Sequence, residues 1–556
     1  MVLPVLAIGS TVSVYTPGGF GVSWGCIMNI CRTPFKKFAL FLAGFTVLAL
    51  VAMLGDGASA AMAGVRAASQ APQTGGTMTV LETSSFAGAW PMGLDPATDT
   101  SDAADDPYME AIYGDLFQPE NGGKMVPDLA TGYKFTNGGK NVDIFLRHGV
   151  TFQDGTPFNA AAVAWNITRD LDPKNACICD SSFPVASVTT SGNYTVVMHL
   201  RQVFAPIIEA FAEQAPDWIA SPTAVAKMGE KAFASMPVGA GPFQVTADVL
   251  NSTLTLKKYN NYWQKGRPYL NGLVFKTIGN DQAAVEAMMA GDGQMEQFPF
   301  TFSVVQAAMK NPKLHVDTIP GAGPGGIQMN TAIAPFNNIK AREAIYYATN
   351  PQALNKVLSG GLGKPTQSMD GPGSLFPELK VPGYRTYNLA KAKALVKQLG
   401  GLNFTILGGS GNPVATEAMV SEWSAAGMHV QISQVNLAQL VAAFENKSWQ
   451  LTVDGGGSPD PAIGLAGMSW RVASNAPFTG IHDPHLDKLI NQGTGTLNLE
   501  KRSQIYKQIF QYLSDHALLA FTYTAPGYAM ATTNAHGPGI NTNQVIPFWQ
   551  DAWLSH

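Results

Sequence analysis

Charged residues are scarce in this chain. Asp, Glu, Lys and Arg make up 13% of its 556 residues, about half of the share that is usual in soluble domains. The formal net charge is −4, and no basic patch occurs, which excludes a nucleic-acid-binding protein. Low-complexity tracts are also absent, and 46% of the residues are apolar. A packed chain of this length requires two or more lobes.

The sequence lacks the short motifs of common enzyme classes. No Gly-x-Ser-x-Gly, His-Glu-x-x-His or Gly-Lys-Ser/Thr occurs. Residues 321–326 spell Gly-x-Gly-x-x-Gly, but Pro324 interrupts them and a strand-like run follows, so we interpret them as a hinge loop. His482 and His485 have a spacing found in zinc sites, but Asp483 is typical of a helix cap. The sequence therefore predicts no cofactor and no metal.

The N-terminal segment predicts export. A basic stretch (residues 32–37) precedes an apolar run (residues 38–54), and an Ala-Ser-Ala tripeptide ends at Ala60. This pattern is typical of a signal peptide cleaved after Ala60. A membrane anchor is the alternative, because a run of about 17 apolar residues is at the lower limit for a span. Whether translation begins at Met1 or Met28 stays open.

Cysteine is rare, with four residues in the chain. Cys26 and Cys31 lie in the segment expected to be removed, which leaves Cys177 and Cys179. An exported protein meets an oxidising environment, which favours a disulfide. A Cys-x-Cys ring is small and strained, however. A local disulfide and two free thiols are therefore both open.

The most informative stretch is residues 146–162, which read Leu-Arg-His-Gly-Val-Thr-Phe-Gln-Asp-Gly-Thr-Pro-Phe-Asn-Ala-Ala-Ala. An extended run over residues 142–146 leads into it. The Asp-Gly pair predicts a tight turn, because Gly tolerates a positive φ. Asn159 is placed to cap a helix over residues 160–171. The stretch therefore predicts strand, turn and helix in one short segment.

These residues also carry a resemblance. Leu-Arg-x-Gly-Val-x-Phe-x-Asp-Gly-x-Pro-Phe-x-Ala resembles the signature of the family 5 extracellular solute-binding proteins, which are the dipeptide-, oligopeptide- and nickel-binding components of ABC importers. Leu-Asp-Pro at residues 94–96, Pro-Val-Gly-Ala-Gly-Pro-Phe at 237–243 and Pro-Phe-Asn-Asn at 335–338 resemble further motifs of this family. The resemblance spans the chain from Thr77 to the C-terminus.

The resemblance implies an α/β fold of the two-lobed periplasmic binding protein type, of cluster C with an enlarged first lobe. Two crossovers are expected between the lobes, near Gly326 and near Phe521. The expected divisions are a signal peptide with an upstream extension (1–60), a disordered linker (61–76), a first lobe (77–326) with an inserted subdomain (about 116–237), a second lobe (327–516) and a return to the first lobe (517–556).

Periodicity adds a set of expected elements along the chain. Helices are predicted over residues 106–117, 204–213, 281–291, 339–349, 389–399, 415–426, 437–445 and 499–513. Strands are predicted over residues 77–82, 254–259, 327–330, 404–407, 430–432 and 517–523, and residues 184–201 alternate as strands should. The strand over residues 517–523 is expected to return to the first lobe.

The loop at residues 453–461 resembles the family's cleft loop. Aligned on Asp460-Pro461, Gly457 occupies the position of an acidic residue that pairs with the ligand's α-amine in peptide-binding relatives. We therefore expect a ligand other than a free-amine peptide. Asp454 either supplies a charge from a shifted position or bonds the glycine amides of a turn. The candidate ligand-contacting residues are Ser84, Ser85, Trp90, Met329, Asn330, Asp454, Gly457 and Trp470.

These expectations combine into a predicted function. The protein is expected to be a periplasmic monomer that binds a peptide or other small organic solute by lobe closure and delivers it to an ABC permease, without chemistry. Two alternatives remain. One is an exported enzyme, such as a hydrolase with a nonlocal triad, and the other is a metal or haem carrier on the same fold. The sequence does not identify the solute.

Overall fold

A computed structural model describes residues 71–83, 93–98, 106–120, 122–175, 177, 179, 183–212, 214–377, 380–409, 413–435, 437–463, 467–474, 476, 479–537 and 548–556. Residues 71–556 form one compact unit. The predicted signal peptide lies outside the described residues. None of the helices in the described part of the chain is long and apolar enough to cross a membrane.

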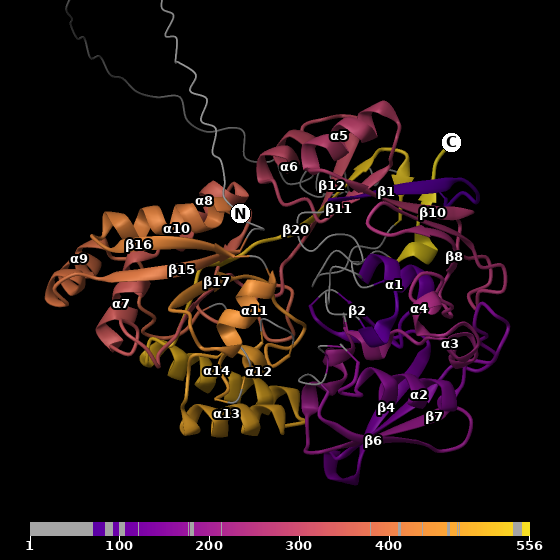
Figure 1. The fold of residues 1–556 in the computed structure, drawn as a ribbon, viewed down its shortest axis with the longest axis horizontal. Helices are drawn as coiled ribbons and strands as arrows, with labels where there is room; N and C mark the ends of the chain where they lie inside the picture. The colour runs from indigo at the N-terminus through magenta and orange to yellow at the C-terminus, as the bar shows by residue number, and fades with distance from the viewer. Residues whose placement is uncertain are drawn as a thin grey trace, which may run out of the picture. The chain divides into compact units, whose positions relative to one another are not determined.

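The first lobe is built on a seven-stranded sheet of order β12-β20-β11-β1-β10-β9-β8. Its strands are β1 Thr77–Thr83, β8 Phe243–Val249, β9 Thr253–Lys258, β10 Gly272–Ile278, β11 Met295–Gln297, β12 Leu314–Ile319 and β20 Gly527–Thr532. β1 is parallel to β10 and β11, and the other pairs are antiparallel. β20, from the C-terminal part of the chain, lies between β11 and β12 (Figure 1).

Helices cover this sheet and complete its core. Tyr108, Met109 and Ile112 of α1 are buried in one apolar cluster with the strands. The helices of the lobe are α1 Asp106–Tyr113, α3 Pro222–Met228, α4 Glu230–Phe233, α5 Asp281–Ala290 and α6 Phe302–Ala308. The short strands β2 Phe117–Pro119 and β3 Met125–Pro127 form a separate hairpin that packs into the core of the inserted subdomain. This apolar burial is the main stabilising contribution to the lobe.

An inserted subdomain carries the strand–turn–helix motif. It holds an antiparallel sheet of order β4-β5-β7-β6 (β4 Ala130–Thr136, β5 Asn141–Leu146, β6 Val185–Thr190, β7 Thr195–Leu200) and the helix α2 Ala160–Asp170. Gly155 has a φ of 84° in the turn. The Asn159 side chain accepts a hydrogen bond from Ala162 N at 3.0 Å. The motif prediction is confirmed, because each of its parts depends on neighbouring residues alone.

The two remaining cysteines lie beyond α2. Cys177 and Cys179 form a disulfide. Cys179 is buried in the apolar core of the inserted subdomain, and Cys177 packs partly against it. Of the two alternatives that the sequence leaves open, the structure has the local disulfide.

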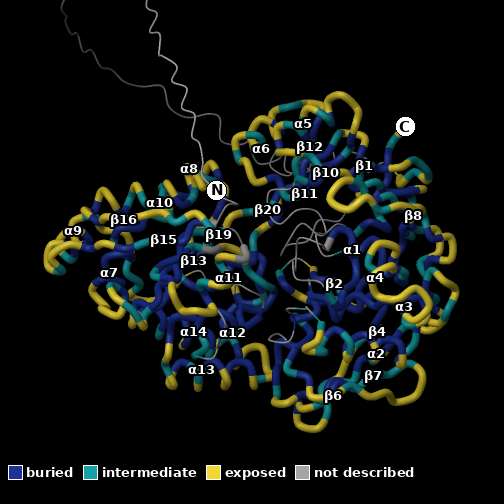
Figure 2. The backbone as a smooth tube through the Cα atoms, in the orientation of Figure 1, coloured by how far each residue is buried: buried dark blue, intermediate teal, exposed yellow. Residues whose placement is uncertain are grey.

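The second lobe is built on a five-stranded sheet of order β16-β15-β17-β13-β18. Its strands are β13 Gly326–Met329, β15 Asn403–Gly409, β16 His429–Val435, β17 Leu451–Asp454 and β18 Leu519–Phe521. Its helices are α7 Ile339–Ala348, α8 Pro351–Ser359, α9 Leu389–Gln398, α10 Pro413–Ala425, α11 Leu437–Glu445, α12 Met468–Arg471, α13 Pro484–Thr494 and α14 Leu499–Asp515. β13 is wholly buried, whereas α9 exposes most of its residues (Figure 2).

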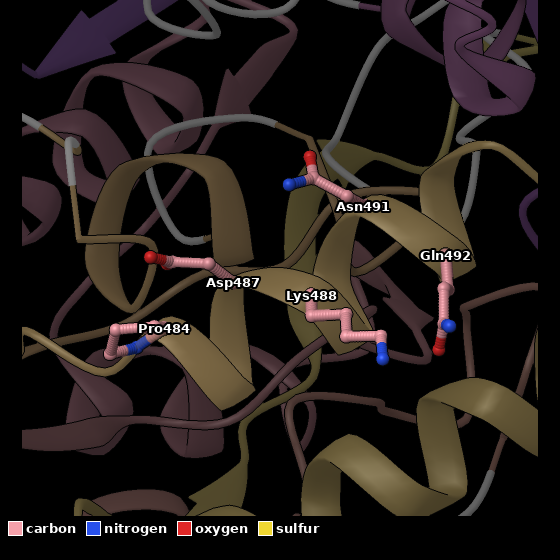
Figure 3. Close-up of a pocket in the computed structure, with 5 residues that line it drawn as sticks. All are labelled: Pro484, Asp487, Lys488, Asn491 and Gln492. Atoms are coloured by element: carbon pink, nitrogen blue, oxygen red, sulfur yellow. The ribbon is translucent and has the colours of Figure 1, made fainter.

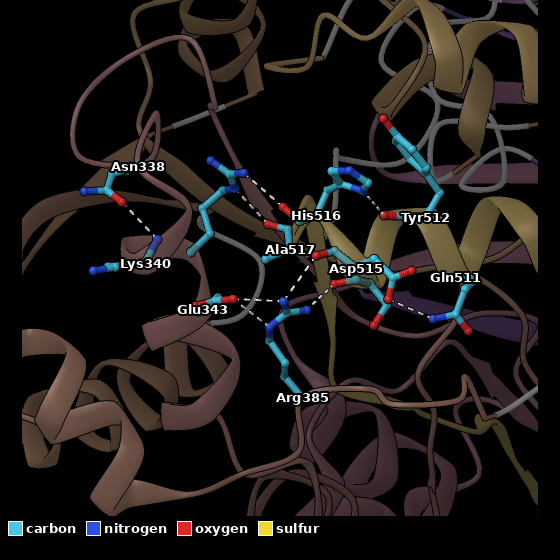
Figure 4. A network of polar contacts seen from close by, with 11 residues as sticks. Asn338, Lys340, Glu343, Arg385, Gln511, Tyr512, Asp515, His516 and Ala517 are labelled. Carbon is cyan, nitrogen blue, oxygen red and sulfur yellow. Dashed lines mark hydrogen bonds and ion pairs between the residues drawn. The ribbon is translucent and has the colours of Figure 1, made fainter.

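Two arginines join α7 to the end of α14. The buried Arg342 donates to the backbone oxygens of His516 at 2.9 Å and Ala517 at 3.0 Å. Figure 4 shows Arg385 between Glu343, at 2.8 Å, and the backbone at the end of α14. Charge-assisted bonds to carbonyl oxygens satisfy the groups that a helix end leaves open. They fix the turn that leads into β18.

One predicted helix is wrong. We expected an α-helix over residues 204–213, but residues 205–211 form two 3-10 turns, η5 Ala205–Ile207 and η6 Glu209–Phe211. Nearly all side chains between Phe204 and Ala212 are buried. The segment therefore lacks the exposed polar face of an amphipathic helix. Pro206 also removes a backbone donor at the start.

The return to the first lobe begins later than expected. We expected residues 517–523 to form the returning strand. β18, within these residues, instead pairs with β13 in the sheet of the second lobe. β20 is the strand that joins the first-lobe sheet. β18 is apolar and buried throughout, which suits a strand of the lobe's interior.

Several buried carboxyl groups lie close together near the C-terminal end of α1. Asp217 accepts hydrogen bonds from the backbone nitrogens of Leu116 at 2.9 Å and Phe117 at 3.1 Å. Burial raises the pKa of Asp115 to about 7. Burial, with repulsion from Asp115, raises the pKa of Asp128 to about 8 despite the opposing charge of Arg147. The fold therefore holds protonated carboxyl groups near neutral pH.

A neutral substitution at Asp128 tests this cluster. The folded pKa lies above the unfolded value, so the folded chain binds an extra proton and loses stability as pH rises from about 4 to about 8. One group changes the unfolding free energy by at most about 1.4 kcal/mol per pH unit. We expect Asp128→Asn to weaken this fall in urea titrations and to stabilise the protein near pH 8. Exposed Asp292→Asn is the control, and an equal loss of stability at every pH would contradict the assignment.

Candidate functional site

The two crossovers lie side by side. The chain passes from β12 to β13 through residues 320–325 and returns from β18 to β20 through residues 522–526. Gly325 N donates to Tyr523 O at 3.2 Å, and Thr522 N donates to Gly325 O at 3.0 Å. A pair of adjacent segments that supplies the covalent connections between two lobes is typical of a hinge.

Glycines bring the loop that follows β17 against this hinge. A Cβ on Gly323 would lie 2.8 Å from the backbone oxygen of Gly456, and a Cβ on Gly457 would lie 2.5 Å from Cα of Gly323. Real Cβ atoms do not approach other atoms so closely, so both positions require glycine. The loop therefore begins in direct backbone contact with the crossover.

The same loop ends on the inserted subdomain. A Cβ on Gly123, in the turn between β2 and β3, would lie 3.1 Å from Cα of Pro459 and 2.8 Å from the backbone nitrogen of Leu375. Ile463 is 2% exposed and belongs to the apolar core of the inserted subdomain. The loop between Asp454 and Ile463 thus runs from the hinge to the first lobe.

A buried charge network holds this loop. Oδ1 of Asp460 accepts hydrogen bonds from Ala462 N and from the Tyr506 hydroxyl, both at 2.9 Å. Nη2 of Arg502 lies 3.4 Å from Oδ2 of Asp460. Burial raises the pKa of Asp460, and the Arg502 charge opposes this shift. The network fixes the loop's conformation from α14.

The segment after the loop adds a buried positive charge. Arg471 ends α12 and is 7% exposed, and burial lowers its pKa to about 9. Its backbone oxygen accepts a hydrogen bond from Nε2 of Gln328 on β13 at 3.3 Å. α12 is thereby attached to β13, the strand between β17 and β18 in the sheet of the second lobe.

Comparison with known proteins shows which family has this sequence. The sequence profile of the bacterial extracellular solute-binding proteins, family 5, matches residues 124–471, which include most of both lobes and the loop. The chain belongs to this family. Its members are non-catalytic substrate-binding proteins of ABC importers.

Two curated relatives share 29% identity with this chain over 385 residues. They are the glutathione-binding proteins GsiB of Salmonella typhi and of Escherichia coli (strain K12), and each alignment covers 68% of this chain and 73% of the relative.

Two solved structures share the two-lobed fold. DppA of Helicobacter pylori in complex with the peptide STSA gives a TM-score of 0.75 at 20% identity, and covers 87% of this chain and 99% of its own. AgaA of A. tumefacien R10 in complex with agropinic acid gives a TM-score of 0.71 at 22% identity, with 86% and 99% covered. The predicted fold class is confirmed.

The predicted site residues of this family 5 protein fall into three groups. Ser84, Ser85 and Trp90 lie outside the described residues. Asp454 ends β17 opposite Gly326, and Gly457 follows in the loop. These two are brought together at the hinge.

The remaining three candidates lie in the second lobe. Met329 is buried in its apolar core. Nδ2 of Asn330 donates to the backbone oxygen of Trp449 at 2.9 Å. Trp470 is 8% exposed on α12. Contact with a ligand stays a prediction for all eight candidates.

Sequence reasoning missed the network around Arg502. Arg502 and Tyr506 are four residues apart on α14 and therefore share one face of the helix. That spacing was the available sign that both could reach one partner. Nothing in the sequence identified the partner as Asp460, because the two segments meet only in the folded chain.

A shallow hollow on α13 is a different feature. Its lining residues are Pro484, Asp487, Lys488, Asn491 and Gln492, and Figure 3 shows them on one helix. A single helix face does not enclose a solute. Asp483 caps this helix, accepting from His485 N at 3.0 Å and Leu486 N at 3.1 Å, as predicted. Among the described residues, no group of three or more His, Cys, Asp or Glu suits a metal ion.

Substitution of Gly457 tests the contact between loop and hinge. The added methyl group of Gly457→Ala would overlap the backbone of Gly323, and we expect a loss of about 1–3 kcal/mol in urea denaturation. Gly455→Ala is the matched control, because a Cβ on Gly455 has open space around it. Equal stability of the two variants would show that the loop does not lie against the crossover.

Proposed function

We propose that this protein binds a peptide-like or other small organic solute between its lobes, outside the cytoplasm, and delivers it to an ABC permease as a monomer and without chemistry. The observation that carries the proposal is the pair of hydrogen-bonded crossovers at Gly325, Thr522 and Tyr523. Two connections that lie side by side permit the lobes to rotate about one line while their internal packing is kept.

The relatives support a small organic ligand. The two curated relatives are named for glutathione, and the two solved structures hold a tetrapeptide and agropinic acid. The loop between Asp454 and Ile463 offers one wall that spans from hinge to first lobe. Closure around a solute buries most of its surface, and a few polar groups fix its orientation.

The packing of Gly457 narrows the ligand class. The resemblance places an acidic residue of peptide-binding relatives at this position, where it pairs with the ligand's α-amine. Gly457 carries no charge, and a side chain there would meet the Gly323 backbone. An ammonium group buried without a partner is costly. We infer that the natural solute does not present a free amine to position 457.

Native mass spectrometry of the purified protein is the direct test. We expect one organic solute in a one-to-one complex, and its mass should be unchanged after release by mild denaturation. A released product that differs from the supplied solute would support the exported-enzyme alternative. Bound metal or haem in protein purified without either would support the carrier alternative.

A thermal-stability assay tests the ligand class. Ligand at about 100 times its Kd stabilises a protein by about 2.7 kcal/mol, which is readily measured. We expect no stabilisation by alanyl-alanine, because its amine has no partner at Gly457. N-acetylated peptides, which lack a free amine, are the comparison compounds, together with glutathione, whose free amine is carried by a γ-linked glutamyl group. Stabilisation by alanyl-alanine that N-acetylation abolishes would contradict the inference from Gly457.

Export is tested by N-terminal sequencing. We propose that the precursor is cleaved after Ala60, because the Ala-Ser-Ala tripeptide follows the apolar run. The mature protein recovered from the periplasmic fraction should therefore begin at Ala61. Recovery of the uncleaved chain in the membrane fraction would support the membrane-anchor alternative.

A further inference from the structure

The second lobe contacts the inserted subdomain at points away from the hinge. Leu375 and Pro459 meet Gly123 in the β2–β3 turn. A Cβ on Gly139, between β4 and β5, would lie 3.1 Å from Cδ1 of Leu497. These contacts join two lobes that are covalently linked only through the crossovers. A rotation that moved the lobes apart about the hinge would separate them.

Ionisable groups lie within this contact. We call the group of Tyr133, Glu209, Asp460, Arg502 and Tyr506 the clasp. Nη2 of Arg502 lies 3.4 Å from Oδ2 of Asp460 and 3.8 Å from Oε1 of Glu209. The side chain of Arg502 is 2% exposed, that of Asp460 is 0% and that of Glu209 is 12%. The clasp therefore excludes most of the water that would otherwise solvate these charges.

The second lobe assembles most of the clasp by itself. Asp460, Arg502 and Tyr506 all belong to that lobe, and the Arg502 guanidinium also lies 5.3 Å from the ring centroid of Phe376. The Arg502–Asp460 pair is neutral and does not depend on closure. Glu209 lies on η6 of the inserted subdomain, so it comes from the other lobe and would leave the clasp if the lobes moved apart. Closure thus adds a second carboxyl group to a pair that is already balanced.

The added carboxyl group is poorly compensated in its charged form. The titratable groups that face Glu209 are Arg502 and Tyr506 on α14, Asp460 in the loop and Tyr133 on β4. Arg502 is the one cation among them, and it is shared with Asp460. No described residue donates a hydrogen bond to Oε2 of Glu209. Burial of a carboxylate that shares its one cation with a second carboxylate is unfavourable. Burial of the neutral carboxyl group costs less free energy.

We propose that Glu209 sets the affinity of the protein for its solute from outside the binding space, by entering the clasp in its protonated form. Lobe closure then takes up one proton. The link from closure to solute affinity rests on the proposed function, whereas closure itself does not. Glu209 is in this sense a positioning residue, because it acts on the solute only through the position of the lobes.

The sign of the effect follows from the two states. Burial raises the pKa of Glu209 to about 7, with Asp460 adding to the shift and Arg502 opposing it. Separation of the lobes would expose the side chain to water and return its pKa toward the ordinary value of 4.5. The closed state therefore holds an extra proton between these two values, so closure is favoured as pH falls below about 7. The ratio of closed to open protein changes by at most about tenfold per pH unit.

Small-angle X-ray scattering of the dialysed, solute-free mature protein tests the proposal. We expect the radius of gyration of the wild type to decrease as pH is lowered from about 8 to about 5. Glu209→Gln keeps the shape of the neutral carboxyl group, so we expect it to be compact at every pH. Glu209→Ala should also lose the pH response. A full pH response in both variants, or none in the wild type, would overturn the proposal.

A matched control separates the clasp from general acid effects. Glu343 pairs with Arg385 at 2.8 Å, and both lie within the second lobe. Glu343→Gln removes a paired carboxylate without touching a contact between lobes, so it should keep the wild-type pH response. Loss of the response in this variant as well would count against Glu209 as the source. Because scattering needs no solute, a failure of glutathione to stabilise the protein would bear on the proposed solute class alone.

Discussion

The backbone of the first crossover, residues 320–325, lies directly against the backbone of the loop between Asp454 and Ile463. Gly323 and Gly457 approach so closely that neither position has room for a side chain. This contact determines where the loop begins, and it places the loop between the lobes. It also leaves no room at position 457 for the acidic side chain that the family resemblance would place there. One steric constraint thus links the hinge, the start of the loop and the ligand class that we propose.

This loop is held at both of its ends and near its middle. Asp454 pairs with the crossover strand, Asp460 is held by Tyr506 and Arg502, and Ile463 is buried in the inserted subdomain. A segment restrained in this way moves with the lobes and has little freedom of its own. Closure of the lobes therefore brings the loop into one defined conformation, and preorganised contacts of this kind reduce the entropic cost of binding.

The sequence predicted the features that depend on neighbouring residues. The turn at Gly155, the cap at Asn159 and the alternation of strand and helix in the second lobe are of this kind. The turns at residues 205–211 were missed because burial on all sides decides their conformation. The contact of Glu209 with Arg502 was missed because the residues are far apart in the chain. Ligand contacts at Ser84, Ser85 and Trp90 stay predictions.

The scarcity of charge gives this protein its dependence on protons. With 13% charged residues, few cations are near any carboxyl group that the fold buries. Asp128 and Glu209 illustrate two outcomes of the same constraint, since burial raises both pKa values. Asp128 lies within one lobe, so its proton affects folding. Glu209 lies between lobes, so its proton affects closure. The position of a buried carboxyl group relative to the hinge therefore decides whether a lower pH stabilises the fold or favours the closed state.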